Sequence, residues 1–122
     1  MRIPLLAVVT QNVASLVAKA SQIGLTITVL GEIRFGILNG RKKQKYTELL
    51  DNFLSNVRVE VLDITNTTAK LYGEIATQLR QVGRSIRPND IWIAALCKEH
   101  GYKLATNDDG FEDILGLEIA KT

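Results

Sequence analysis

A chain of 122 residues can bury one hydrophobic core but not two, so a single domain over residues 1–122 is expected. Hydrophobic residues make up 46% and charged residues 23% of the chain, which excludes an intrinsically disordered protein. A net charge of only +2 is compatible with a nucleic-acid partner but does not argue for one.

The cysteine content and the lengths of the apolar runs predict a cytoplasmic protein. The single cysteine, Cys97, cannot form an intramolecular disulfide, and its apolar surroundings predict a small core residue. No apolar run reaches the length of a membrane span. The opening Met1–Val9 superficially resembles a signal sequence, but it is short, has a proline near its start and lacks a convincing cleavage site.

The first third of the chain contains helical and strand-like patterns in alternation. The predicted elements are a helix over Asn12–Ser21, a strand over Leu25–Val29, and a helix over Leu30–Leu38 that ends at Asn39-Gly40. The segment Leu5–Thr10 is open between two interpretations, because its β-branched residues favour a strand and its leucines favour a helix.

The rest of the chain continues the alternation. The clearest amphipathic helix covers Tyr46–Val57, and its apolar face is well suited to a partner subunit. The further predicted elements are a strand over Val57–Val61, a helix beginning at Asp63 to Thr65, a loop over Gly83–Pro88, a helix over Asn89–His100 that stops at Gly101, a strand over Tyr102–Thr106, a helical turn over Phe111–Leu115 and a strand over Leu117–Ile119. Strands that alternate with helices indicate a parallel sheet covered on both faces, with four clear strands and Leu5–Val9 as an open fifth.

Three of the 13 acidic residues are placed where they could do chemistry. Glu32 follows a strand between Gly31 and Gly36, where bare backbone would allow another group to come close. Asp90 opens an apolar helix, and Asp108 lies two residues past a strand. In a parallel sheet all three fall at the carboxyl ends of strands, the usual ligand edge. The following acids are explained by solubility on solvent faces: Glu48, Asp51, Glu60, Glu74, Glu99, Glu112 and Glu118.

Carboxylates gathered at one edge predict a site for a hard divalent cation. They would repel one another unless a cation neutralised them, and oxygen-only ligands favour Mg²⁺ or Mn²⁺ over zinc. With a phosphodiester bound, such an ion can polarise a phosphoryl oxygen and activate a water for in-line attack.

Each candidate also has a purely structural interpretation. Asp90 alone could be a helix cap, Asp108 and Asp109 an Asx turn before Gly110, and Glu32 a first-turn acid facing a helix dipole. Other candidates have structural interpretations as well: a surface position for His100, core or rim packing for Trp92, and a solvated helix start for Lys42, Lys43 and Lys45.

Several of these segments together resemble one family. Gly31–Gly36 after a threonine-rich strand, Pro88–Ala95, and Thr106–Asp108 followed by Phe111 and Gly116-Leu117 resemble PIN-domain proteins, more narrowly the VapC toxins of bacterial toxin–antitoxin pairs. The resemblance covers nearly the whole chain from Gln11 onward. It implies a three-layer α/β/α Rossmann-like PIN domain with a mainly parallel sheet. It also implies a Mg²⁺- or Mn²⁺-dependent endoribonuclease that hydrolyses RNA phosphodiester bonds, is bound by a cognate antitoxin and forms a homodimer.

The resemblance also assigns roles to individual residues. It implies that Glu32, Asp90 and Asp108 are the second, third and fourth family acids, which hold the metal and carry catalysis. Thr106 matches the hydroxyl residue that lines the site, and Asn89 the polar residue beside the third acid. Asp109 is a further supporting candidate beside Asp108.

Two departures from the family pattern put catalysis in question. The family's opening strand ends in Asp-Thr-Asn, and no such motif occurs here. One alignment puts Ile3–Leu6 on the helix after that motif, so that the family's first strand is missing and Leu5–Val9 could be recruited to fill the gap. The other makes Leu5–Val9 the strand and Thr10–Asn12 a degraded motif, but leaves too few residues before Glu32. We prefer the first.

The second departure is Gly110, where an acid or histidine is common just before Phe111. The departures motivate an alternative function, a catalytically impaired PIN-like module that still binds an antitoxin or RNA. A third interpretation is a phosphate-handling α/β domain of another family, which would prefer small phosphoesters to RNA.

Overall fold

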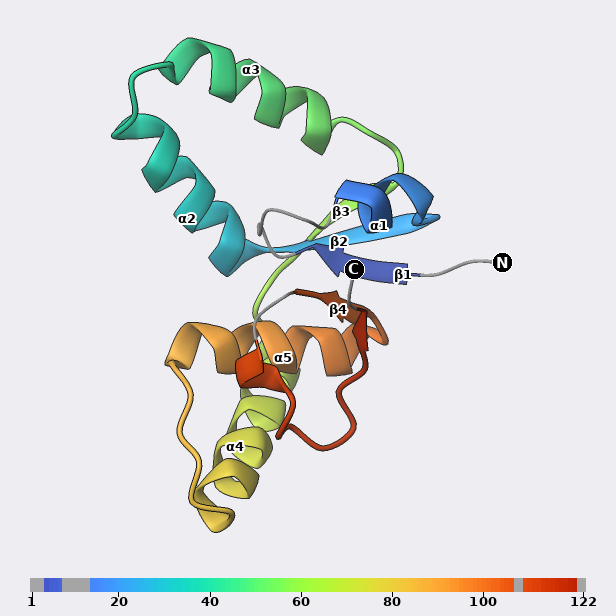
Figure 1. The fold of residues 1–122 in the computed structure, drawn as a ribbon, viewed down its shortest axis with the longest axis vertical. Helices are drawn as coiled ribbons and strands as arrows, with labels where there is room; N and C mark the ends of the chain where they lie inside the picture. The colour runs from blue at the N-terminus through green and yellow to red at the C-terminus, as the bar shows by residue number, and fades with distance from the viewer. Residues whose placement is uncertain (1–3, 8–13, 107–108, 121–122) are drawn as a thin grey trace.

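A computed structural model describes residues 4–7, 14–106 and 109–120 and shows an α/β domain (Figure 1). Its sheet contains β1 (Pro4–Ala7), β2 (Gln22–Thr26), β3 (Val59–Leu62), β4 (Lys103–Ala105) and β5 (Ile119–Ala120). The strand order is β3-β2-β1-β4-β5, and every pairing among these described strands is parallel. The expected parallel α/β architecture is confirmed.

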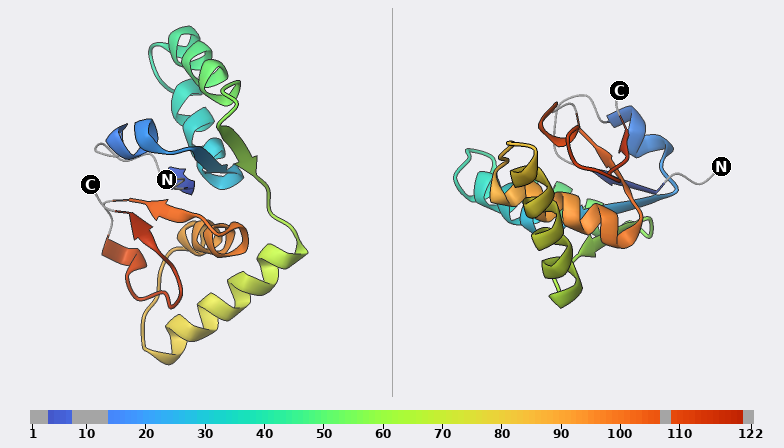
Figure 2. Two further views of the ribbon diagram at one scale, coloured as in Figure 1. Left: turned by 90° about the vertical axis from the view of Figure 1, so that its right-hand side faces the viewer. Right: turned by 90° about the horizontal axis from the view of Figure 1, so that it is seen from below.

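Helices cover both faces of this sheet. They are α1 (Ala14–Lys19), α2 (Ile27–Leu38), α3 (Lys43–Leu54), α4 (Asn66–Gln81) and α5 (Pro88–His100), with a 3-10 turn η1 (Asp109–Phe111) before β5. Helix α1 lies on one face, whereas α4 and α5 pack together on the other (Figure 2). Helices α2 and α3 form a hairpin that projects from the β2–β3 side of the sheet (Figure 1). None of the described helices is long and apolar enough to cross a membrane.

Strand β1 occupies the centre of the sheet. Leu6 pairs with Gly24 of β2 on one side and with Leu104 of β4 on the other. The placement of Ile3–Leu6 on a helix is therefore wrong for the described Pro4–Leu6, because a central position satisfies the backbone groups of this short segment on both edges. The continuation through Val8 and Thr10 lies outside the described residues, and the absence of the family's first strand stays a prediction.

The boundary between β2 and α2 differs from the expected one. The strand predicted for Leu25–Val29 ends at Thr26, and the helix begins at Ile27. Thr26 is fully buried, and its hydroxyl accepts a hydrogen bond from the backbone N–H of Val29 at 3.2 Å. Because a threonine in this position satisfies a free N–H of the first turn, it starts the helix despite the alternating pattern. Glu32 consequently lies inside α2 rather than directly after a strand.

Helix α5 forms the centre of the core. Its residues Ile93–Cys97 are buried, which confirms Cys97 as a core residue. Gly101 adopts φ +72° and caps the helix, as predicted, because a left-handed residue favours glycine. The ring of Trp92 packs against that of Tyr72 with 4.3 Å between centroids, which confirms its structural role.

The apolar face predicted for Tyr46–Val57 is only partly a core face, because Phe53 and Leu54 are partly buried against the core but other positions are not. Helix α3 ends at Leu54, and within it Leu50 is buried, whereas Tyr46 and Leu49 are exposed. The α2–α3 hairpin stands away from the sheet, so much of this face meets solvent (Figure 1). Val57 lies beyond the helix and is fully exposed.

Glu99 was wrongly assigned to a solvent face. The hydroxyl of the buried Thr68 donates a hydrogen bond to Glu99, and Thr65, the N-cap of α4, lies 3.5 Å from the same carboxylate. The bond ties the C-terminal part of α5 to the first turn of α4. Glu60, also assigned to solvent, is exposed but accepts a hydrogen bond from the hydroxyl of Tyr102.

Candidate functional site

Two elements that carry candidate acids meet at the carboxyl-terminal edge of the sheet. Helix α2 leaves this edge directly after β2, and α5 begins there because it runs back along the sheet before β4. The amide Nδ2 of Asn89 donates a hydrogen bond to Oε1 of Glu32 at 3.0 Å. The structure therefore brings Glu32 beside the first turn of α5, where Asp90 follows Asn89.

Asp90 is not the helix cap. The N-cap of α5 is Arg87, Pro88 takes the first helical position, and the backbone N–H of Asp90 donates to the carbonyl of Arg87 at 3.0 Å. The side chain of Asp90 is only 14% exposed, and its Oδ2 lies 3.5 Å from Nη2 of the exposed Arg87. An acid in the first turn is favoured by the helix dipole, so the local structure supports a charged, largely enclosed carboxylate here.

Glu32 is exposed and lies in the second turn of α2, so the first-turn dipole interpretation is wrong for it. The expected close approach at the flanking glycines is also wrong: beyond the adjacent backbone of α2 itself, a Cβ at Gly31 or Gly36 would meet no atom of the described residues within 4 Å. The partner that restrains Glu32 is instead Asn89, which reaches it from another element.

Buried hydroxyls lie at the ends of two strands. Thr106 follows β4 and is fully buried, as is Thr26 at the end of β2. The hydroxyls of Thr26 and Thr28 lie 2.9 Å apart. Neither Thr26 nor Thr28 was singled out as a site residue, although the alternating threonines at a strand end were a visible signal.

The third candidate acid, Asp108, lies outside the described residues. Its neighbour Asp109 is exposed and opens η1. Among the residues that the structure describes, no three Asp, Glu, His or Cys side chains gather closely enough to hold a metal ion. The three-carboxylate site therefore stays a prediction. The two described candidate acids lie on elements that the Asn89–Glu32 hydrogen bond joins, and their carboxylates would offer only oxygen ligands, which fits a hard divalent cation and not zinc.

The other reactive side chains lie away from this edge. His100 is exposed at the end of α5, ten residues and about 15 Å along the helix from Asp90. Cys97 is buried, and burial raises the pKa of its thiol well above the ordinary value, so it is not a nucleophile. The carboxylates are thus the groups at this edge that could support catalysis.

Comparisons with known proteins agree with the fold. The model of the PIN domain matches residues 8–116. The chain is 35% identical over 97 residues to "Ribonuclease VapC2" of Rickettsia felis, an alignment that covers 80% of this chain and 71% of the relative. It is 27% identical over 95 residues to "Ribonuclease VapC5" of Mycobacterium tuberculosis, covering 78% and 70% of the two chains.

The chain is also similar in fold to solved structures of VapBC complexes. The crystal structure of VapBC2 from Rickettsia felis, bound to a DNA fragment from its promoter, matches with a TM-score of 0.75 and 32% identity, over 90% of this chain and 81% of that one. DNA-bound VapBC from Salmonella typhimurium matches with a TM-score of 0.82 over 99% and 98% of the two chains, and its 24% identity supports the fold alone. With the family model covering most of its length, the chain belongs to the PIN domain family.

Proposed function

We propose that this chain is an endoribonuclease toxin of the VapC kind, which hydrolyses RNA phosphodiester bonds with Mg²⁺ or Mn²⁺ and is bound by a cognate antitoxin. The similarity to proteins named VapC ribonucleases supports the activity, and the similarity to VapBC complexes supports the antitoxin. The structural observation that carries the proposal is the hydrogen bond from Asn89 to Glu32, because it unites the acid-bearing parts of α2 and α5.

Each candidate residue has its own role in the proposed reaction. Glu32 and Asp90, with Asp108 as the third acid, would hold the cation. When bound, a divalent cation neutralises phosphate charge and lowers the pKa of a nearby water. Asn89 keeps the carboxylate of the exposed Glu32 turned toward α5, and Thr106 supports the acidic segment that follows β4. Water attacks the phosphorus atom, and the 3′-oxygen of the preceding nucleotide leaves.

The decisive variant is Asp90→Asn, which keeps the size of the side chain but removes its charge. We expect it to lower RNA cleavage by about 100-fold or more, since it would remove one ligand of the cation that neutralises charge at the reacting phosphate. The matched control is Glu74→Gln, the same chemical change on the exposed face of α4. Circular dichroism should show unchanged helix content in both. Full activity of Asp90→Asn, or of the wild type in excess EDTA, would remove this mechanism.

A second candidate is a PIN module that binds its antitoxin or RNA but no longer cleaves. One specific observation favours it: the first acidic residue of the chain is Glu32, so the central strand and the segment that follows it supply no carboxylate. Purified protein that binds an antitoxin but leaves RNA intact at every Mg²⁺ and Mn²⁺ concentration would support this candidate. Cleavage of RNA that depends on Mg²⁺ or Mn²⁺ would rule this candidate out. Homodimerisation and a cytoplasmic location stay predictions.

A further inference from the structure

One face of α2 leads from Glu32 away from the sheet. Residues three or four apart are neighbours on a helix surface, so Glu32, Phe35 and Asn39 follow one another along this face. Phe35 is 71% exposed, and Nδ2 of Asn39 donates to its backbone carbonyl at 2.9 Å. The backbone position of Phe35 therefore lies about 4.5 Å along the helix axis from that of Glu32, and its side chain is open to solvent.

The same hairpin carries a concentrated positive charge. Five of the chain's 15 lysines and arginines lie within its segment 34–45, and no acidic residue lies between Glu32 and Glu48. We call them the hairpin cations: Arg34, Arg41, Lys42, Lys43 and Lys45. All are exposed, and none forms an ion pair with a described carboxylate. Nζ of Lys45 lies 5.7 Å from the ring centroid of Tyr46.

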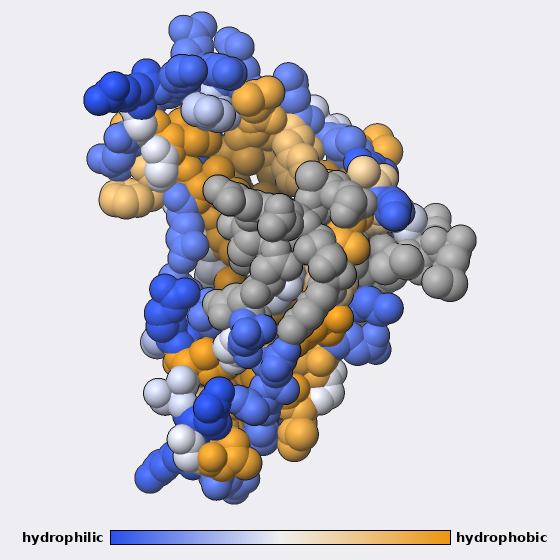
Figure 3. Space-filling model, viewed as in Figure 1, coloured by the Kyte–Doolittle hydropathy of each residue, from blue (hydrophilic) through white to orange (hydrophobic). Residues whose placement is uncertain are grey.

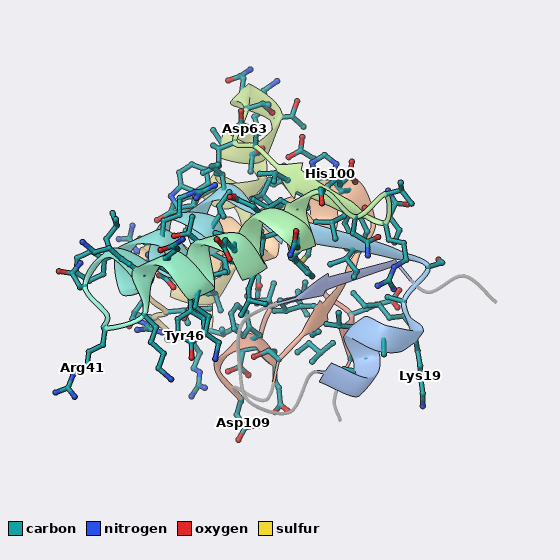
Figure 4. The ribbon with its side chains drawn as sticks, turned by 90° about the horizontal axis from the view of Figure 1, so that it is seen from above. Lys19, Arg41, Tyr46, Asp63, His100 and Asp109 are labelled. Atoms are coloured by element: carbon teal, nitrogen blue, oxygen red, sulfur yellow. The ribbon has the colours of Figure 1, made fainter. Side chains whose placement is uncertain are left out.

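Figure 3 shows the surface of the hairpin, and Figure 4 shows the directions of two of its side chains. Strongly hydrophilic residues cover the far end of the hairpin, with hydrophobic residues directly beneath them (Figure 3). Arg41 and Tyr46 project toward the same side of the molecule as Asp109 of η1, the turn that follows the candidate acidic segment (Figure 4). One hairpin cation and one exposed ring thus face the same side of the molecule as η1 (Figure 4).

We infer that this surface, made of Phe35 and the hairpin cations, binds single-stranded RNA, with the ring of Phe35 stacked on a base beside the edge that carries Glu32 and Asp90. Proteins that bind single strands combine a positive track for the backbone with aromatic rings for the bases. Unpaired positive charge repels itself unless an anion covers it, which favours a polyanion over an apolar protein segment. This inference rests on the proposed ribonuclease function.

The arrangement also selects the form of the RNA. In a duplex the bases are stacked on one another, so a ring on a helix surface cannot reach their faces. A single strand or a loop can turn a base outward onto Phe35. The preferred substrate is therefore an unpaired stretch, cut beside the stacked base.

The first test measures binding apart from cleavage. The probe is a fluorescein-labelled oligouridine RNA of about 12 nucleotides, a length within the site sizes of single-strand binding folds, and EDTA prevents cleavage. By fluorescence anisotropy, Phe35→Ala should weaken binding by about 5- to 100-fold, and Phe35→Trp should restore it. The same RNA with abasic central residues should bind wild type and Phe35→Ala equally. The control is Leu115→Ala, which removes an apolar side chain that is 69% exposed in a segment bonded to α4 and α5 rather than to α2.

A second variant tests the charge. Replacing Arg41 and Lys42 together by glutamine should flatten the dependence of log K on log salt by about 1.4, the value for two single-strand phosphates. Lys19→Gln, on α1, should leave the slope unchanged.

The outcomes separate this inference from the proposed function. If wild type binds the probe in a base-dependent way but never cleaves RNA, the proposed ribonuclease function is wrong and the inferred RNA-binding surface is supported. Wild type that cleaves while Phe35→Ala binds both probes like wild type would overturn the inference. Equal rescue by Phe35→Leu and Phe35→Trp would also overturn it, because a leucine can fill an apolar contact with a protein but cannot stack.

Discussion

Nδ2 of Asn89 lies 3.0 Å from Oε1 of Glu32, and this bond joins two residues 57 positions apart in the chain. It spans from the first turn of α5 to the second turn of α2. An exposed glutamate has many rotamers, and ordering it costs conformational entropy. The amide of Asn89 holds one of these rotamers, so the geometry at the acidic edge depends on a residue that carries no charge itself.

Asn89→Ala should therefore lower the kcat of RNA cleavage by about tenfold and change KM little, because the carboxylate of Glu32 is retained but no longer oriented. Steady-state cleavage of a labelled RNA measures both constants. Asn89→Asp should be worse, since it sets a like charge against Glu32. Asn52→Ala, on the exposed surface of α3, is the control. An unchanged kcat in Asn89→Ala would show that Glu32 needs no such support.

Asp108 and Asp109 follow β4, and their asparagine variants can be compared for their effects on RNA cleavage and metal affinity. Asp108→Asn should abolish detectable cleavage, because we propose Asp108 as a metal ligand. Asp109→Asn should reduce it by less than about tenfold, since this exposed residue only supports the segment. Isothermal titration with Mn²⁺ should show the same order of loss in metal affinity. The reverse order would move the ligand role from Asp108 to Asp109.

Glu99 should matter for stability and not for cleavage. Glu99→Ala leaves the hydroxyl of the buried Thr68 without its acceptor, which should cost about 1–3 kcal/mol of unfolding free energy. Urea unfolding followed by circular dichroism measures the loss. Glu74→Ala, an exposed glutamate on α4, should change stability by less than about 0.5 kcal/mol. Equal stability of the two variants would show that the bond between α5 and α4 contributes nothing.

Tyr102 should make the fold sensitive to alkali. Burial, with the hydrogen bond to Glu60, raises the pKa of its phenol above the ordinary value. Above about pH 10 the unfolded chain releases this proton while the folded chain keeps it, so the stabilisation is complete below that pH and declines as pH rises. Unfolding free energies measured from pH 8 to pH 11 should fall for the wild type. The unfolding free energy of Tyr102→Phe should fall less steeply over the same pH range. An equally steep fall in the two proteins would show that Tyr102 is not the group responsible.

The acidic edge shows where prediction from sequence stops. Glu32 and Asp90 could be selected because strand ends and helix starts are visible in the sequence. Their connection through Asn89 could not, since it depends on the angle at which α2 leaves β2 and on the starting point of α5. The misplaced start of α2 has a local origin instead: the capping hydrogen bond that the hydroxyl of Thr26 accepts from the N–H of Val29 outweighed an alternating pattern that extended three residues further.

What the sequence determined by itself is local. The alternation of strands and helices, the apolar run of α5 and its end at Gly101 follow from side-chain periodicity and from the conformations that a glycine permits. The tertiary structure decided the rest: the central place of β1, the exposure of part of the apolar face of α3, the hydrogen bond of Glu99 with the buried Thr68 and the contact of Asn89 with Glu32. Each of these depends on partners far away in the chain, and no local pattern encodes which partner a backbone edge or a carboxylate meets once the core has closed.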